Sequence, residues 1–301
     1  MLIPNYLKKG DRIRVVSPAG KVEKEKIRSG MNLFEQAGFE VVWGDHVFDN
    51  HFQFAATDTR RLRDLQQALD DPQCRAIVCA RGGYGAIRLV DQLDLSNFRQ
   101  QPKWLVGFSD ITVLHALLQN EGFCSIHGAM PGFYLKDDQP SDSFNELLKT
   151  LKGENSPVRV PPQAFNRPGE SSGRLTGGNL SMIYSLMGTP LEPATDGNIL
   201  FIEDLAEYLY HLDRIMQSLK LAGKLESLKG LLVGGLTEMK DNDAPFGQSP
   251  QEIIREAVKA YDFPVCFDFP AGHIDRNLPL VFGAGYRLEV NKSTGSTLTM
   301  L

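Results

Sequence analysis

The sequence predicts an α/β protein. Its amino-terminal domain is expected to be a doubly wound, mostly parallel sheet with helices on both faces, followed by a second, smaller α/β domain. Two observations support this. Short apolar runs rich in β-branched residues alternate with amphipathic helical runs. A stretch rich in Pro, Gly and Ser then interrupts the pattern. We place the domains at residues 1–152 and 174–301, with a linker over 153–173.

The amino-terminal domain is expected to alternate strands and helices along the chain. Residues 13–16 form the first apolar run. The helical spacing of Met31 and Phe34 predicts a helix over about 23–37, which Gly38 would end. The same alternation predicts strands over 39–43, 76–80, 104–107 and 124–126, and helices over 57–69, 86–92 and 110–120.

The second domain resumes the alternation after Gly177-Gly178-Asn179. We expect helices over 180–187, 208–221 and 250–261, and strands over 198–202, 231–234 and 264–267.

Composition restricts the class of protein. Hydrophobic residues make up 42% of the chain and charged residues 23%, as in ordinary globular proteins. A net charge of -5 gives no basic surface for nucleic acid. The amino terminus lacks the apolar core of a signal peptide, and no stretch is long enough to span a bilayer. We therefore expect a cytoplasmic protein with no nucleic-acid or membrane partner.

The four cysteines form no CxxC pair and have no metal-ligand spacing with histidines. They lie in or beside apolar runs, which predicts buried free thiols. We expect neither a metal site nor a cofactor.

Chemistry in open α/β sheets is carried beyond the carboxyl ends of the strands. Ser109 follows the predicted strand 104–107 and precedes a helix that begins near Asp110. A serine at such a turn can act as a nucleophile, because N–H groups at the helix start can receive an oxyanion. An ordinary helix N-cap is the alternative, and Ile111 stands where a nucleophile elbow usually has glycine.

The loop Arg81-Gly82-Gly83-Tyr84-Gly85 follows another strand. Adjacent glycines let backbone approach a ligand closely. The loop could cradle a phosphate, supply the N–H of Gly82 or Gly83 to an oxyanion beside Ser109, or form a tight turn without a chemical role.

An activated serine needs a base, and the base needs an orienting acid. Among six histidines, His127 and His273 lie beside glycine after apolar strands. Glu203 ends an apolar strand, where a carboxylate needs a partner. A helix cap or a pair with Arg214 is the other interpretation. Ser109, Glu203 and His273 are thus a candidate catalytic triad.

Several motifs in this order resemble one known family. They are Arg81-Gly82-Gly83-Tyr84-Gly85, Gly107-Phe108-Ser109-Asp110-Ile111-Thr112, His127-Gly128, Gly177-Gly178-Asn179-Leu180, Ile202-Glu203-Asp204 and Pro270-Ala271-Gly272-His273. The chain resembles the LD-carboxypeptidase family, serine peptidase family S66, over nearly its whole length.

The resemblance implies a two-domain serine hydrolase, usually a homodimer, that needs no metal. Family members remove the terminal D-alanine from cytoplasmic murein tetrapeptides during cell-wall recycling, and relatives cleave peptide-nucleotide antibiotics of the microcin C type. It implies that Ser109 is the nucleophile, Glu203 the orienting acid and His273 the base. Glu207 remains a rival for the acid.

Backbone N–H groups of Asp110 and of Gly82 or Gly83 would then form the oxyanion hole. Arg81 and Arg174 are candidates for binding the terminal carboxylate of the substrate. A non-catalytic protein with two lobes that close on a peptide or sugar is the alternative from another class.

Overall fold

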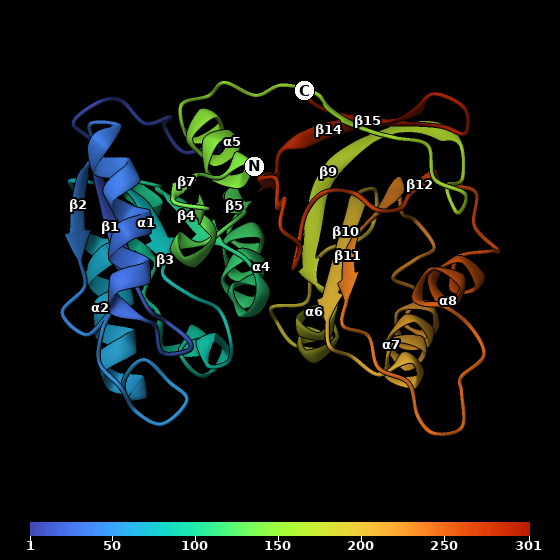
Figure 1. Cartoon of the computed structure of the whole chain (residues 1–301), viewed down its shortest axis with the longest axis horizontal. Helices are drawn as coiled ribbons and strands as arrows, with labels where there is room; N and C mark the ends of the chain where they lie inside the picture. The colour runs from blue at the N-terminus through green and yellow to red at the C-terminus, as the bar shows by residue number, and fades with distance from the viewer. The chain divides into compact units, whose positions relative to one another are not determined.

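The computed structural model describes residues 1–301, which form two compact units (Figure 1). Unit 1 contains Met1–Asn155 and Asp275–Val281, and unit 2 contains Ser156–Ile274 and Phe282–Leu301. The return of residues 275–281 to unit 1 differs from the expected division. Ser143 of unit 1 explains it, because its Oγ accepts the N–H of Asn277 at 2.9 Å and donates to the carbonyl of Asp275 at 3.2 Å.

The expected linker is partly ordered sheet. Strands β8 (Val158–Val160) and β9 (Gly169–Asn179) fall wholly or partly within 153–173. They pair antiparallel with β15 (Gly295–Met300) and β14 (Gly285–Asn291), respectively. Partners from the far end of the chain therefore give strand structure to a stretch that looks like a loop.

The sheet of unit 1 confirms the doubly wound prediction. Its strand order is β13-β5-β4-β3-β1-β2, and the pairs β1/β2, β1/β3, β3/β4 and β4/β5 are parallel. The strands are β1 (Arg12–Val16), β2 (Glu40–Trp43), β3 (Cys74–Cys79), β4 (Trp104–Gly107), β5 (Ser125–His127) and β13 (Leu280–Phe282). The order reverses between β1 and β3, and in open α/β sheets ligands bind outside the carboxyl ends of the strands at such a point.

The helices of unit 1 cover the two faces of this sheet. They are α1 (Lys24–Gln36), α2 (Asp58–Asp70), α3 (Ser96–Gln100), α4 (Thr112–Asn120) and α5 (Asp142–Leu151). The helix predicted over 86–92 is instead two 3-10 turns, η1 (Ala86–Arg88) and η2 (Val90–Gln92). Because both faces are covered, all four residues of β4 are buried, which explains its continuous apolar run.

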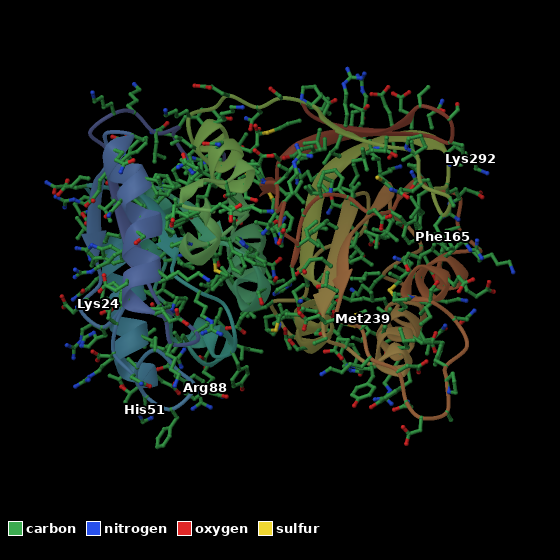
Figure 2. The ribbon with its side chains drawn as sticks, in the orientation of Figure 1. Lys24, His51, Arg88, Phe165, Met239 and Lys292 are labelled. Carbon is green, nitrogen blue, oxygen red and sulfur yellow. The ribbon has the colours of Figure 1, made fainter.

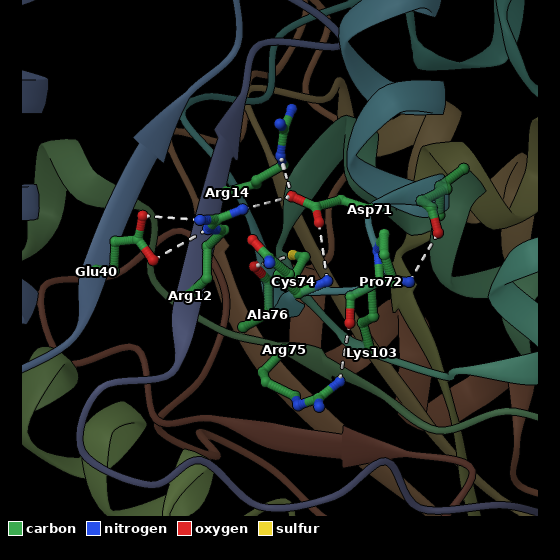
Figure 3. Close-up of polar contacts among 11 residues, drawn as sticks. Arg12, Arg14, Glu40, Asp71, Pro72, Cys74, Arg75, Ala76 and Lys103 are labelled. Carbon is green, nitrogen blue, oxygen red and sulfur yellow. Dashed lines mark hydrogen bonds and ion pairs between the residues drawn. The ribbon is translucent and has the colours of Figure 1, made fainter.

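Charged side chains at the amino ends of the strands have a structural role (Figure 3). Arg12 donates to both carboxylate oxygens of Glu40, at 3.0 and 3.1 Å, and so links β1 to β2. Arg14 donates to Asp71, just after α2, at 2.8 Å. Lys24 begins α1, His51 lies between β2 and α2, and Arg88 ends η1; His51 and Arg88 lie near the lower edge of unit 1 in Figure 2.

Unit 2 has a mixed seven-stranded sheet with the order β12-β11-β10-β9-β14-β15-β8. Its parallel part consists of β9, β10 (Ile199–Leu205), β11 (Gly230–Thr237) and β12 (Val265–Cys266). Its helices are α6 (Leu180–Leu186), α7 (Leu209–Leu221) and α8 (Pro250–Ala257). In Figure 1, α7 and α8 lie beside each other near β11.

Helix α8 is shorter than predicted. Arg167 donates to the carbonyls of Val258 at 2.9 Å and Phe263 at 2.8 Å, which holds the chain in a loop after the helix. No helix of the chain is both long and apolar enough to cross a membrane.

Gly177 provides a test of the sheet of unit 2. Its φ is 127°, and a Cβ there would lie 1.9 Å from the carbonyl oxygen of Phe201 on β10. We expect Gly177→Ala to lower the melting temperature measured by circular dichroism by several degrees or more, since β9 and β10 cannot separate within the sheet. Gly285→Ala is the control, because a Cβ there meets nothing closer than 3.8 Å. Equal melting temperatures for the two variants would contradict the close approach.

Candidate active site

Ser109 lies at a strained strand-to-helix turn in unit 1. Its φ is 67°, in the left-handed region that non-glycine residues rarely adopt, and the 3-10 turn η3 (Ser109–Ile111) leads from it into α4. Gly107 permits the turn, because a Cβ there would lie 2.9 Å from the side chain of buried Ile111. A nucleophile elbow has the same kind of strained turn after a strand.

Gly82 packs directly against this serine. A Cβ at Gly82 would lie 2.9 Å from Cβ of Ser109 and 3.2 Å from its Oγ. The carbonyl of Gly82 accepts the N–H of Gly20 at 3.0 Å, whereas neither Gly82 nor Gly83 donates its own N–H to a backbone carbonyl. The loop after β3 therefore packs against the serine, and the N–H groups of Gly82 and Gly83 are not used in backbone hydrogen bonds of the turn.

The side chain of Asp110 holds the β3 loop in place. It is almost fully buried, and its Oδ2 accepts the N–H of Ala86 at 2.8 Å. Burial raises the pKa of Asp110 to about 6, although the Ala86 N–H and the charge of Arg61 lower it. At neutral pH the carboxylate is mostly ionised and ties the start of α4 to the β3 loop.

The sequence analysis missed Arg61, which joins the loops after β1 and β3. Its guanidinium is 1% exposed and donates to the carbonyls of Pro18 and of Gly85, the latter at 3.1 Å. The available signal was its spacing. Arg61 lies four residues before the buried Leu65 and hence on the apolar face of α2.

Two buried histidines support β4 and β5. His115 contacts Oγ of Ser125 with Nδ1 at 2.8 Å and the carbonyl of Gly107 with Nε2 at 2.9 Å. Burial lowers the pKa of His115 to about 4, so this ring is neutral at physiological pH. The ring of His127 packs on Phe108 with centroids 5.9 Å apart. Both side chains are fully buried.

Unit 2 brings Glu203 and His273 together. Oε2 of Glu203 lies 2.7 Å from Nδ1 of His273 and 3.1 Å from its backbone N–H. Glu203 is fully buried. Since a carboxylate only accepts, Nδ1 must carry the proton, and the neutral ring has its lone pair on Nε2. Gly272 makes this approach possible, because a Cβ there would lie 2.7 Å from Cβ of Glu203.

The turn that carries His273 is fastened to β11. The carbonyl of Ala271 accepts the N–H of Gly235 at 3.0 Å, and the carbonyl of His273 accepts the hydroxyl of Thr237 at 3.1 Å. Burial lowers the pKa of His273, but the hydrogen bond and charge of Glu203, with smaller effects from Asp204 and Glu238, leave it raised. The imidazole is therefore oriented and is a stronger base than usual.

The three neighbouring carboxylates have different partners. Asp204 accepts from the side chain of Asn179 at 2.9 Å and from the hydroxyl of Ser181 at 2.6 Å, and so fixes the start of α6. Glu207 contacts His211 and accepts from the hydroxyl of Ser181 at 3.0 Å. Of the three, only Glu203 is hydrogen-bonded to His273.

The two arginines predicted as candidates for binding the terminal carboxylate of the substrate, Arg81 and Arg174, lie in different places. Arg81 is exposed next to Gly82 and donates to the carbonyl of Lys21 at 2.8 Å. Arg174 is exposed on β9, opposite Gly285 of β14. Asn179, the residue of β9 that lies opposite Glu203, is five residues further along the strand. Arg174 and Glu203 are thus about 16 Å apart along β9, and the structure does not bring Arg174 to the site.

Other polar residues near the strand ends have hydrogen-bond partners within unit 1, and no metal-binding cluster is present. Ser17 donates to the carbonyl of Val47 at 3.0 Å, and His46 contacts the buried Asp64 at 2.7 Å. All four cysteines are buried and free. No group of three or more His, Cys, Asp or Glu side chains is arranged to hold a metal ion.

Comparison with known proteins covers most of the chain. The LD-carboxypeptidase N-terminal domain of family S66 matches residues 13–128, and the LD-carboxypeptidase C-terminal domain matches residues 172–288. A probable murein peptide carboxypeptidase of Bacillus subtilis (strain 168) is 32% identical, with 97% of this chain and 92% of that protein aligned.

Two further relatives are also carboxypeptidases that align with most of the chain. The murein tetrapeptide carboxypeptidase of Pseudomonas aeruginosa is 28% identical over 93% of this chain and 94% of its own. The crystal structure of a muramoyltetrapeptide carboxypeptidase from Oxalobacter formigenes superposes with a TM-score of 0.86 at 28% identity, covering 96% of this chain and 98% of that one. The resemblance seen in the motifs is confirmed: the chain belongs to the LD-carboxypeptidase family of peptidases, family S66.

Proposed function

We propose that this protein is a serine carboxypeptidase that cleaves an L-to-D peptide bond and releases the terminal D-alanine of murein tetrapeptides in the cytoplasm. The observation that carries the proposal is the hydrogen bond from Nδ1 of His273 to the buried Glu203. It orients the imidazole with its proton on Nδ1, as a base that deprotonates a nucleophile requires. The strained turn at Ser109 supplies that nucleophile.

The mechanism is acyl transfer. Nε2 of His273 takes the hydroxyl proton as Oγ of Ser109 attacks the carbonyl carbon before D-alanine. Glu203 stabilises the imidazolium that forms. The N–H groups of Asp110 and of Gly82 or Gly83 receive the oxyanion, worth about 3 kcal/mol per donor.

His273 then protonates the nitrogen of D-alanine as the C–N bond breaks, which leaves an ester on Ser109. Water, deprotonated by His273, attacks the ester and releases the shortened peptide with the serine restored. This cycle needs Ser109 and His273 to come within hydrogen-bond reach although they belong to different units.

The family resemblance also supports a homodimer, which we propose as the functional form.

The substrate and nucleophile are tested together. We expect wild-type protein to release D-alanine from murein tetrapeptide, detected by mass spectrometry, and Ser109→Ala to lower kcat by at least about 10³-fold with an unchanged circular dichroism spectrum. Release of a nucleotide from a microcin C conjugate instead of D-alanine would show the antibiotic substrate. A wild-type protein that binds peptide but neither releases D-alanine nor reacts with a serine-directed phosphonate would be a binding protein.

Gly82 tests the packing of the β3 loop on the serine. A methyl group there would press on Cβ and Oγ of Ser109. We expect Gly82→Ala to lower kcat by about 10-fold to 10³-fold while the melting temperature changes little. Gly128→Ala is the matched control at the carboxyl end of β5, where the nearest atom would be 3.4 Å away. Normal kcat in Gly82→Ala would refute the proposed oxyanion geometry.

The acid is tested through the pH profile. The base must be neutral to act, so kcat/KM should rise with pH through the pKa of His273, which burial lowers but the hydrogen bond and charge of Glu203 raise above its usual range. Glu203→Gln removes the charge that raises this pKa. We expect it to shift the acidic limb to lower pH and to lower kcat by roughly 10³–10⁴-fold. Glu207→Gln should change neither the pH profile nor kcat. An inactive Glu207→Gln variant beside an active Glu203→Gln variant would show that Glu207, not Glu203, is the acid.

A further inference from the structure

A cavity of about 250 Å³ lies in unit 1, where α1 begins beside the carboxyl end of β3. We call it the α1 pocket. Its apolar lining includes the buried side chains of Ile27, Ala80 and Met130. Its rim carries three exposed charged residues: Glu23, Lys26 and Arg81. An apolar lining with charges of both signs at the rim suits a ligand with an aliphatic stem and a charged end.

Two lining residues of the α1 pocket adjoin or contact residues next to Ser109. Arg81, on its rim, immediately precedes Gly82, which packs against Ser109. Phe133, in its wall, packs on the ring of Phe108 with centroids 5.8 Å apart. Phe108 is the residue before the serine. A substrate side chain next to the carbonyl that Ser109 attacks could therefore reach the α1 pocket, because the pocket and Ser109 both belong to unit 1.

The rim charges are positioned to bind a ligand. Arg81 uses Nη1 for the carbonyl of Lys21 at 2.8 Å, which orients a guanidinium with further N–H donors. Nζ of Lys26 lies 6.0 Å from the ring centroid of Phe133, and so above the pocket wall. These two cations suit a carboxylate, and Glu23 suits an ammonium group.

We propose that the α1 pocket binds the side chain of the residue that donates the scissile carbonyl, and that it selects a side chain ending in an amino-acid zwitterion. This rests on the proposed function. In murein peptides that residue is diaminopimelate, which has such an end, or lysine, which ends in an amine alone. The cavity holds roughly eight water-sized groups, about the number of heavy atoms in the diaminopimelate side chain. Lys26 and Arg81 bind its carboxylate and Glu23 its ammonium group, so Arg81 serves the side chain rather than the terminal carboxylate.

The test compares kcat/KM for D-alanine release from two tetrapeptides that differ only in diaminopimelate or lysine at the third position. Lys26→Met should lower kcat/KM about 10-fold for the diaminopimelate peptide and leave the lysine peptide within about twofold, since that peptide has no carboxylate to lose. Glu23→Gln should lower kcat/KM for both peptides. Lys26→Arg should restore the preference for the diaminopimelate peptide over the lysine peptide.

Lys24→Met is the matched control, because Lys24 is exposed on the same helix and its Nζ lies over the ring of Phe48, away from the pocket. It should leave both peptides unchanged. An equal effect of Lys26→Met on both peptides, or no effect on either, would overturn the α1 pocket assignment alone. If the wild type releases D-alanine from neither peptide, the proposed function fails and the assignment with it.

Discussion

The left-handed backbone of Ser109 is the constraint on which the site in unit 1 depends. A non-glycine residue at φ 67° costs about 1–3 kcal/mol, and the surrounding contacts must offset this cost. Gly107 and Gly82 have no Cβ, which leaves room for Ile111 and for the serine itself. The carboxylate of Asp110 then binds the β3 loop through Ala86. The same contacts that hold the strained turn thus also hold the β3 loop against the serine.

The acid–base pair depends on an analogous arrangement in unit 2. Gly272 lets the turn approach Glu203, and hydrogen bonds to β11 hold that turn. The chain passes from unit 2 to unit 1 immediately after Ile274, one residue beyond His273. Ser143 then fastens the segment that follows. Ser109, the proposed nucleophile, and His273, the proposed base, are therefore each held within their own unit, and a short stretch of chain connects His273 to the unit that carries Ser109.

The sequence predicted the parallel sheets and the strand-end residues because both follow from local patterns. Continuous apolar runs identify strands covered on both faces, and their carboxyl ends are where Ser109 and Glu203 lie. Strand β14 was missed although it alternates buried and exposed residues and pairs with β15 directly after it, so a local signal for this hairpin was available. Arg61 was missed although its spacing from Leu65 places it on the buried face of α2, because an arginine is expected to be exposed until the carbonyls that surround it are known.

Two ionisable groups of the candidate site have shifted pKa values, and they act on different parts of it. Burial lowers the pKa of His273, but the hydrogen bond and charge of Glu203 leave it raised. Burial also raises the pKa of Asp110, to about 6. Protonation of His273 would occupy the lone pair on Nε2, whereas protonation of Asp110 would weaken the link between the serine turn and the β3 loop through Ala86. Acidification therefore acts on the proposed base in unit 2 and on the serine turn in unit 1 through two separate groups.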